Sequence, residues 1–123
     1  MSHALRLCWV ALALWLPAHL QAAPAIYSGQ NDLPVVTLAE LPVEARDTLR
    51  DIKLGGPFAY ERDGAVFGNY ERRLPKQQRG YYHEYTVNTP GANNRGARRI
   101  ISGEMNEYYY TADHYKSFKR IRE

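Results

Sequence analysis

The sequence predicts an α+β fold in which one N-terminal helix packs on an antiparallel β-sheet. Two observations carry this prediction. Residues 41–53 show the spacing of apolar side chains that is typical of a helix, and no helical spacing occurs after residue 58. Short runs rich in aromatic and β-branched residues, separated by turn residues, fill the rest of the chain. One helix followed by several strands indicates a helix covering one face of a sheet.

The predicted helix is amphipathic and has a clear start and end. Pro42 lies in its first turn, where a missing backbone N–H costs nothing. Four apolar side chains share one face of the helix: Leu41, Ala45, Leu49 and Ile52. The opposite face is charged. The segment Gly55-Gly56-Pro57 ends the helix, because glycine accepts a left-handed backbone and proline cannot continue the hydrogen-bond ladder.

Four strands are predicted, over residues 82–87, 97–102, 107–111 and 117–121. The first two flank a turn-rich segment and therefore form an antiparallel pair. In this hairpin Glu84 and Arg99 lie on neighbouring strands, where their side chains can meet. Ile100 is expected in the core, and Ile101 on the polar face with Arg99. The strands alone leave two interpretations open, an ordinary Glu–Arg sheet pair and a functional site.

The first 25 residues are predicted to be a secretory signal peptide. Arg6 supplies the positive charge, residues 7–16 are apolar, and small residues surround the cleavage site expected after Ala22 or Ala25. The apolar stretch is too short for a membrane-spanning helix. We therefore expect a secreted or periplasmic protein whose mature form does not enter the membrane.

Removal of this leader leaves a flexible tail over residues 26–36 and one domain over residues 37–123. Cys8, the only cysteine of the chain, lies in the leader, so the mature domain forms no internal disulfide. The formal net charge of +3 is too small to indicate nucleic-acid binding by itself. The basic residues gather in the C-terminal two thirds, which also fits a solvated basic face.

Several side chains stand out as candidates for chemistry. Glu84 is a single carboxylate within an aromatic strand, where it must face either solvent or a site that uses it. Arg95 and Arg99 follow on the next strand, and His114 lies in a loop near the C-terminus. Together they offer a base, an acid and guanidinium groups, although a lone loop histidine is more often incidental. No cluster of metal ligands remains after the leader, so we expect neither a metal nor another cofactor.

Four strings occur in order in the C-terminal half: Gly80-Tyr81-Tyr82-His83-Glu84-Tyr85-Thr86-Val87, Thr89-Pro90-Gly91, Arg95-Gly96-Ala97-Arg98-Arg99-Ile100-Ile101 and Asp113-His114-Tyr115. With upstream strings around Leu41-Pro42, Gly56-Pro57-Phe58 and Asp63-Gly64, they resemble the small bacterial guanyl-specific ribonucleases related to barnase. The resemblance covers about residues 38–121. It implies the microbial ribonuclease fold. It also implies a metal-independent endoribonuclease that cleaves single-stranded RNA 3′ of guanosine through a 2′,3′-cyclic phosphate.

The resemblance also implies roles for individual residues. Glu84 matches the general base of the family and His114 the general acid. Arg95 and Arg99 match the arginines that bind the scissile phosphate, and Tyr115 matches a tyrosine that contacts it. The guanine-recognition loop corresponds to Phe67, Gly68, Asn69, Tyr70 and Glu71.

Within that loop, Glu71 is suited to accept both N–H groups on the pairing edge of guanine. Tyr70 departs from the family, whose members commonly carry an arginine there that helps to cover the base. A tyrosine ring at this position can stack on the base instead.

The expected partners are an RNA substrate and, from the resemblance, an acidic barstar-like inhibitor protein; we expect the enzyme itself to be a monomer. Two alternatives stay open. The same fold can serve as a secreted antibacterial ribonuclease toxin with an acidic immunity partner. It can also act as a non-catalytic RNA-binding module.

Overall fold

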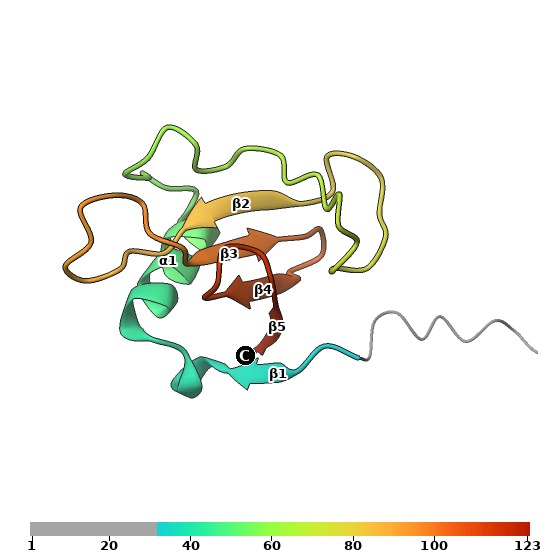
Figure 1. Ribbon diagram of the computed structural model, residues 1–123, viewed down its shortest axis with the longest axis horizontal. Coiled ribbons are helices and arrows are strands. Elements are labelled where there is room, and N and C mark those ends of the chain that lie inside the picture. The colour runs from blue at the N-terminus through green and yellow to red at the C-terminus, as the bar shows by residue number, and fades with distance from the viewer. Residues whose placement is uncertain (1–31) are drawn as a thin grey trace, which may run out of the picture.

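The computed structural model describes residues 32–123 (Figure 1). The predicted signal peptide, residues 1–25, and most of the predicted tail lie outside the described residues. In chain order the elements are β1 (Val35–Thr37), a 3₁₀ turn (Leu38–Glu40), α1 (Val43–Leu54), β2 (His83–Thr86), β3 (Arg99–Ser102), β4 (Tyr108–Thr111) and β5 (Lys119–Arg122). The predicted helix and the four predicted strands are all present, with bounds that differ by a few residues.

The five strands form one twisted sheet in the order β1-β5-β4-β3-β2 (Figure 1). The pairs β2–β3, β3–β4 and β4–β5 are antiparallel, as predicted, whereas β1 pairs in parallel with β5. The domain therefore begins before residue 37, where the sequence places the end of the tail, because Val35 and Val36 belong to β1. A three-residue strand is too short to show an alternating pattern, and its partner lies at the other end of the chain.

Helix α1 begins at Val43, two residues later than predicted, and Pro42 is its N-cap. The carbonyl of Pro42 accepts the N–H groups of Ala45 and Arg46, which satisfies two donors of the first turn. At the other end Gly55 has a φ of 80°, and the N–H of Gly56 donates to the carbonyl of Asp51 at 2.9 Å. The helix therefore ends at the glycine pair, as the sequence predicts.

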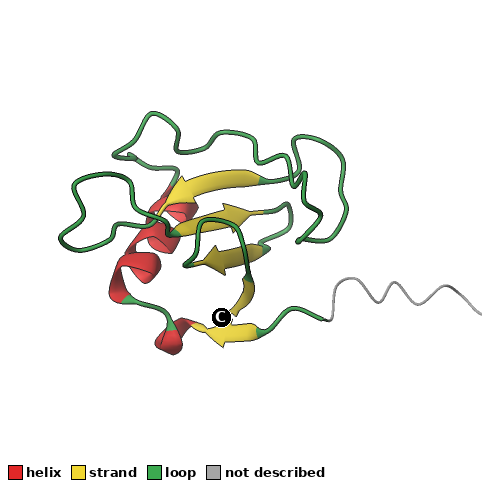
Figure 2. Ribbon diagram, in the orientation of Figure 1, coloured by secondary structure: helices red, strands yellow, loops and turns green. Residues whose placement is uncertain are grey.

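The sheet separates two apolar clusters, and α1 covers only one of its faces (Figure 2). The cluster beneath α1 contains Val36, Leu41, Ala45, Leu49, Val87, Ile100, Tyr108, Tyr110 and Ile121. The cluster on the opposite face contains Leu74, Tyr82, Ile101, Tyr109 and Phe118. Long loops rather than a helix cover this second face (Figure 2).

The register of the central hairpin places the polar candidates on this loop-covered face. Glu84 is opposite Ile101, and Thr86 is opposite Arg99. Glu84 and Arg99 are therefore diagonal neighbours on one face, as predicted. Ile101 was expected on a polar face, but it is fully buried in the second cluster, because the loops over this face supply apolar partners. No helix within residues 32–123 is both long enough and apolar enough to cross a bilayer.

Candidate active site

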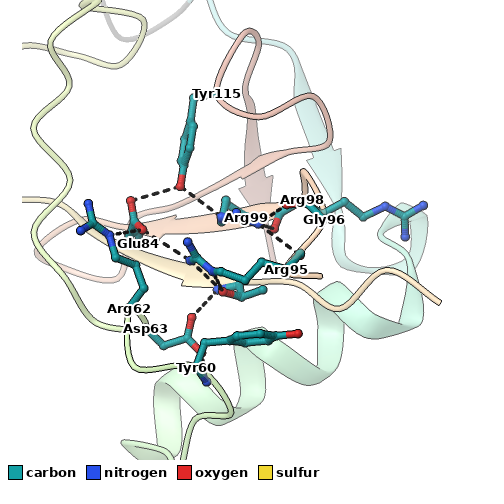
Figure 3. A network of polar contacts seen from close by, with 10 residues as sticks. Tyr60, Arg62, Asp63, Glu84, Arg95, Gly96, Arg98, Arg99 and Tyr115 are labelled. Atoms are coloured by element: carbon teal, nitrogen blue, oxygen red, sulfur yellow. Dashed lines mark hydrogen bonds and ion pairs between the residues drawn. The ribbon is translucent and has the colours of Figure 1, made fainter. Parts of the chain in front are cut away.

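Glu84 is the centre of a polar network on the face away from α1 (Figure 3). Its side chain is almost fully buried, with 5 % of the residue exposed. The carboxylate accepts three contacts. Arg62 Nε lies 3.2 Å and Arg95 Nη2 3.5 Å from Oε1, and the hydroxyl of Tyr115 donates to Oε2 at 3.1 Å. A carboxylate is tolerated at this depth because cations and a hydroxyl replace the water it has lost.

Arg99 is held by neutral oxygen atoms. It is 2 % exposed, and its Nη1 donates to the backbone carbonyls of Gly96 at 2.9 Å and Arg98 at 2.7 Å. Its Nε donates to the hydroxyl of Tyr115 at 3.1 Å. Within residues 32–123 it forms no ion pair, so its charge remains available to an anion that enters the site.

Arg95 comes from the loop between β2 and β3, and the strand beneath it fixes its direction. Its Nε and Nη2 donate to Thr86 Oγ1 at 3.0 and 2.9 Å. Its guanidinium lies 5.9 Å from the centroid of the Tyr60 ring. Arg95 therefore contacts Glu84 directly, and Arg99 reaches it through the Tyr115 hydroxyl, so that two guanidinium groups, a type of group that binds phosphoryl oxygens, lie beside the carboxylate.

Tyr115 joins the carboxylate to the arginine, since its hydroxyl donates to Glu84 and accepts from Arg99 (Figure 3). Burial raises the pKa of the Tyr115 hydroxyl, and the charge of Glu84 raises it further while Arg99 lowers it. The hydroxyl therefore stays protonated at neutral pH and keeps its donor. A single phenol oxygen fixes the relative positions of two of the charged candidates.

The turn before Tyr115 sets the position of His114. Both residues have a left-handed backbone, with φ of 54° and 69°. Asp113 stabilises this turn by accepting from the side chain and the backbone N–H of Ser117 and from Thr111 Oγ1. These hydrogen bonds lower the pKa of Asp113 to about 2.

The backbone of His114 is tied to the loop before β3, since its N–H donates to the carbonyl of Ala97 at 2.9 Å. Its imidazole is exposed, and the centre of the imidazole ring lies 4.8 Å from that of Tyr115. The imidazole is therefore open to solvent and lies beside the phenol that contacts Glu84.

The predicted recognition loop adjoins the network through stacked rings. Phe67 and Tyr115 are nearly parallel, with an interplanar angle of 20° and centroids 5.3 Å apart. Asn69 has a φ of 51°, and its amide holds the loop closed. Its Nδ2 donates to the Leu74 carbonyl at 2.9 Å, and its Oδ1 accepts the Leu74 N–H at 3.1 Å. The side chain of Asn69 therefore shapes the loop, rather than facing a ligand.

A narrow slot of about 160 Å³ opens between this loop and the tyrosine. Its lining residues are Phe67, Asn69, Tyr70, Glu71, Arg73, Tyr115 and Phe118. Most of the wall is aromatic, and Glu71 places one exposed carboxylate at the rim, where its Oε2 accepts from Arg73 Nε at 2.8 Å. Aromatic walls with one hydrogen-bonding edge fit a flat, polar-edged ring such as a nucleobase.

The structure thus joins Glu84, Arg95, Arg99 and Tyr115 in one network, with His114 and the loop of residues 67–71 beside it. Sequence reasoning missed Arg62. Its segment has no periodic pattern, and it reaches the site through backbone bonds: the Gly64 N–H donates to the Glu84 carbonyl, and the Glu84 N–H donates to the Ala65 carbonyl. Tyr60, which lies beside Arg95, has the same lack of signal. Thr86 is on the Glu84 face of a predicted strand, but alternation alone does not predict that its hydroxyl holds Arg95. No group of three or more metal-ligating side chains occurs in residues 32–123.

Similar proteins show which family this chain belongs to. A ribonuclease family model matches residues 22–122, which is most of the chain. The protein belongs to the ribonuclease family. Its relatives include guanyl-specific ribonuclease Sa of Kitasatospora aureofaciens, 60% identical over 87 residues that make up 70% of this chain and 91% of the relative. Guanyl-specific ribonuclease St of Saccharopolyspora erythraea is 56% identical over 84 residues, 68% of this chain and 83% of that protein.

Solved structures agree with this ribonuclease in fold as well as in sequence. Ribonuclease Sa2 in complexes with mononucleotides is 50% identical and has a TM-score of 0.73, covering 74% of this chain and 95% of that one. Ribonuclease Sa2 with guanosine-2′-cyclophosphate has a TM-score of 0.70 at 50% identity, covering 73% and 96%. The predicted α+β microbial ribonuclease fold is therefore confirmed.

Proposed function

We propose that this ribonuclease is a guanine-directed endonuclease that cleaves single-stranded RNA 3′ of guanosine, without a metal, through a 2′,3′-cyclic phosphate. The observation that carries the proposal is the Glu84–Tyr115–Arg99 network beside an aromatic slot with a carboxylate rim. Relatives at 56% and 60% identity are named guanyl-specific ribonucleases, and a relative of the same fold has been solved with guanosine-2′-cyclophosphate, which supports both the base and the intermediate.

In the first step RNA supplies its own nucleophile, the ribose 2′-hydroxyl. Glu84 accepts the 2′ proton as the 2′ oxygen bonds to phosphorus. The bond from phosphorus to the 5′ oxygen breaks, and His114, as imidazolium, donates a proton to that leaving oxygen. The products are a 2′,3′-cyclic phosphate and a free 5′-hydroxyl. In the second step water attacks the cyclic phosphate with the two roles reversed.

Arg95 and Arg99 stabilise the charge that grows on the phosphoryl oxygens in the transition state. Both guanidinium groups are fixed before substrate arrives, by Thr86 and by backbone carbonyls, so no reorganisation is needed when the charge develops. Tyr115, bonded to Arg99, offers a further contact to the same phosphate. Arg62 keeps a cation next to the proton-accepting carboxylate.

Guanine is proposed to enter the slot with its pairing edge toward Glu71. Guanine presents N1–H and N2–H side by side, and one carboxylate accepts both. Backbone N–H groups of residues 68–70 are then the donors for O6 and N7. The side chain of Asn69 already closes the loop, so recognition at that residue uses the backbone.

The test is a cleavage assay in EDTA with dinucleotides that differ only in the first base, G or A, followed by chromatography for the cyclic phosphate. We expect cleavage after G, and Glu84→Gln and His114→Ala should each lower turnover by about 10²–10⁴-fold. Glu104→Gln, an exposed carboxylate in the loop after β3, is the matched control and should act like wild type. A Glu84→Gln variant within tenfold of wild type would contradict the assignment. RNA binding without cleavage in the wild type would support the RNA-binding module instead.

We further propose that the mature enzyme acts outside the cytoplasm, because the sequence carries the pattern of a signal peptide, and that it works as a monomer. Expression of the whole chain with N-terminal sequencing of the exported product tests this, with a new terminus after Ala22 or Ala25 as the expected result. Sedimentation of that product gives its oligomeric state. If the protein stays in the cell extract with residues 1–25 still attached, the proposal of export is wrong.

We also propose that an acidic inhibitor protein binds this site. The proposal rests on the position of Arg62, Arg95 and Arg99 beside Glu84, where carboxylates of a protein partner can occupy the place of phosphates. Such binding should be fast and weaken steeply with salt. It also fits the toxin alternative, in which the partner protects the producing cell. If barstar-like proteins at micromolar concentration leave cleavage unchanged in low salt, the inhibitor proposal fails.

A further inference from the structure

Tyr70 has an unusual position for an exposed aromatic residue. It is 82 % exposed, yet its ring lies back across Gly68 with one edge against the glycine backbone. A Cβ atom at Gly68 would be 2.5 Å from both Cε2 and Cζ of the Tyr70 ring, which no packed side chain allows. The ring occupies this place only because the residue two positions earlier is glycine.

A second residue holds the hydroxyl end of the ring. Arg79 Nη1 donates to the Tyr70 hydroxyl at 2.8 Å, and the Arg79 guanidinium lies 6.0 Å from the ring centroid. Arg79 comes from the segment that leads into β2, outside the recognition loop. In the described part of the chain Arg79 forms no ion pair, and the hydrogen bond to this phenol is its one side-chain polar contact. The Tyr70 ring and the Arg79 guanidinium therefore form a pair that lies outside both apolar clusters.

The ring stands between two hollows. On one side is the aromatic slot with Phe67, Glu71 and Tyr115. On the other side is an open hollow of about 290 Å³ whose lining includes Arg72, Lys76 and Arg79. Tyr70 lines both. Phe67 and Asn69 also line both, but Phe67 packs on Tyr115 and Asn69 is bonded to Leu74, so the exposed Tyr70 ring is the part of this shared wall whose position depends on Arg79.

We propose that Arg79 is a positioning residue for base binding, which holds the Tyr70 ring against Gly68 as the fixed outer wall of the slot. The inference rests on the proposed function, because it assigns the slot to the guanine base. A wall that is already in place stacks on the base without first losing its own rotational freedom. Arg79 thus acts through Tyr70, and no contact joins it to Glu84, Arg99 or His114 within residues 32–123.

The proposal makes the phenol oxygen of Tyr70 important. If the ring acted by stacking alone, Tyr70→Phe would equal wild type. If Arg79 holds the ring, Tyr70→Phe and Arg79→Ala remove the same contact from its two ends. Their effects should then be equal and should not add in the double variant. Both should raise KM and leave kcat unchanged, because the groups that move protons and bind the phosphate keep their contacts.

The experiment is steady-state cleavage of a guanosine-containing dinucleotide by wild type, Tyr70→Phe, Arg79→Ala and the double variant. Each should raise KM by about three- to tenfold, the scale of one lost solvent-exposed hydrogen bond, with kcat within about twofold. Lys76→Ala is the matched control, since it removes a cation from the same hollow without touching Tyr70. Gly68→Ala, whose backbone φ is not left-handed, should push the ring away and raise KM as Tyr70→Phe does.

Three results would overturn the inference: KM at the wild-type value in Arg79→Ala, an equal rise in Lys76→Ala, or additive effects in the double variant. Calorimetric titration with guanosine 3′-phosphate measures the dissociation constants of the wild type and the three variants without turnover. If the wild-type protein binds this nucleotide but does not cleave RNA, the proposed function is wrong. The dissociation constants of the four proteins then still test the role of Arg79.

Discussion

Replacement of Tyr115 by phenylalanine removes one oxygen atom from the centre of the site. That oxygen donates to Glu84 at 3.1 Å and accepts from Arg99 at 3.1 Å. The ring remains, and with it the stacking on Phe67. The variant therefore separates the polar bridge from the aromatic packing. Because burial raises the pKa of this phenol, its hydroxyl keeps the proton that it donates to Glu84 at neutral pH.

The expected cost follows from what each partner keeps. A hydrogen bond to a charged group contributes about 1.5–3 kcal/mol, and Tyr115 makes two. Glu84 retains Arg62 and Arg95, and Arg99 retains its backbone carbonyls, so neither is left without a partner. We therefore expect the free energy of unfolding to fall by about 2 kcal/mol. The carboxylate and the guanidinium lose their common anchor, and kcat should fall by about 10- to 100-fold.

Thermal unfolding and dinucleotide cleavage of Tyr115→Phe measure the two effects. Tyr109→Phe is the matched control, because its hydroxyl bonds to the carboxylate of Glu107 at 3.3 Å and lies outside the network. Burial raises the pKa of Tyr109 to about 12. The control should lose about 1 kcal/mol of stability and keep its kcat. If Tyr115→Phe cleaves at the wild-type rate, the bridge has no catalytic role and the reasoning from this network is wrong.

Three further predictions follow from single side chains. Glu71→Ala should lower kcat/KM for cleavage after G, by an amount equal to about 2–4 kcal/mol of lost binding, and leave the poor cleavage after A unchanged. Equal losses for both bases would mean that Glu71 only shapes the loop. Arg99→Lys should lower kcat at least about tenfold, because a point charge cannot replace the fork that contacts Tyr115 and the carbonyls; a silent variant would make Arg99 an ordinary sheet residue. The lowered pKa of Asp113 stabilises the fold above pH 4, and this contribution is lost as the pH falls toward 2. Asp113→Asn should therefore lower the free energy of unfolding by about 1 kcal/mol at pH 6 and not at pH 2, which urea titrations at both values measure.

Strand alternation explains why the central part of the site could be predicted from the sequence. Side chains two apart on a strand share a face, so a hairpin assignment is enough to place Glu84 and Arg99 together. The turn chemistry of the segment between them fixes the pairing. Resemblance to a family supplied the roles of His114 and Tyr115, whose left-handed backbone has no signature in the pattern of the chain.

Other parts of the structure depend on contacts that no local pattern encodes. Arg62 reaches Glu84 because loop backbone pairs with β2 through Gly64 and Ala65. Strand β1 was assigned to a tail, since its three residues gain their conformation from β5. The position of the Tyr70 ring requires both Gly68 and Arg79, a combination of three residues from two segments. Long-range pairing and side-chain packing decide these features.

The parallel pairing of β1 with β5 has a consequence for the timing of folding. Val36 near one end of the described chain is paired with Ile121 near the other, and both belong to the core beneath α1. Because β5 is the last strand, this pairing cannot form until the end of the chain has been made. The sheet therefore stays incomplete while the chain is still emerging from the ribosome. Every candidate catalytic residue precedes β5, yet none is expected to work before synthesis ends. A chain that stops after Phe118 should lack ordered structure by circular dichroism and leave RNA intact, which would spare the ribosomes that made it.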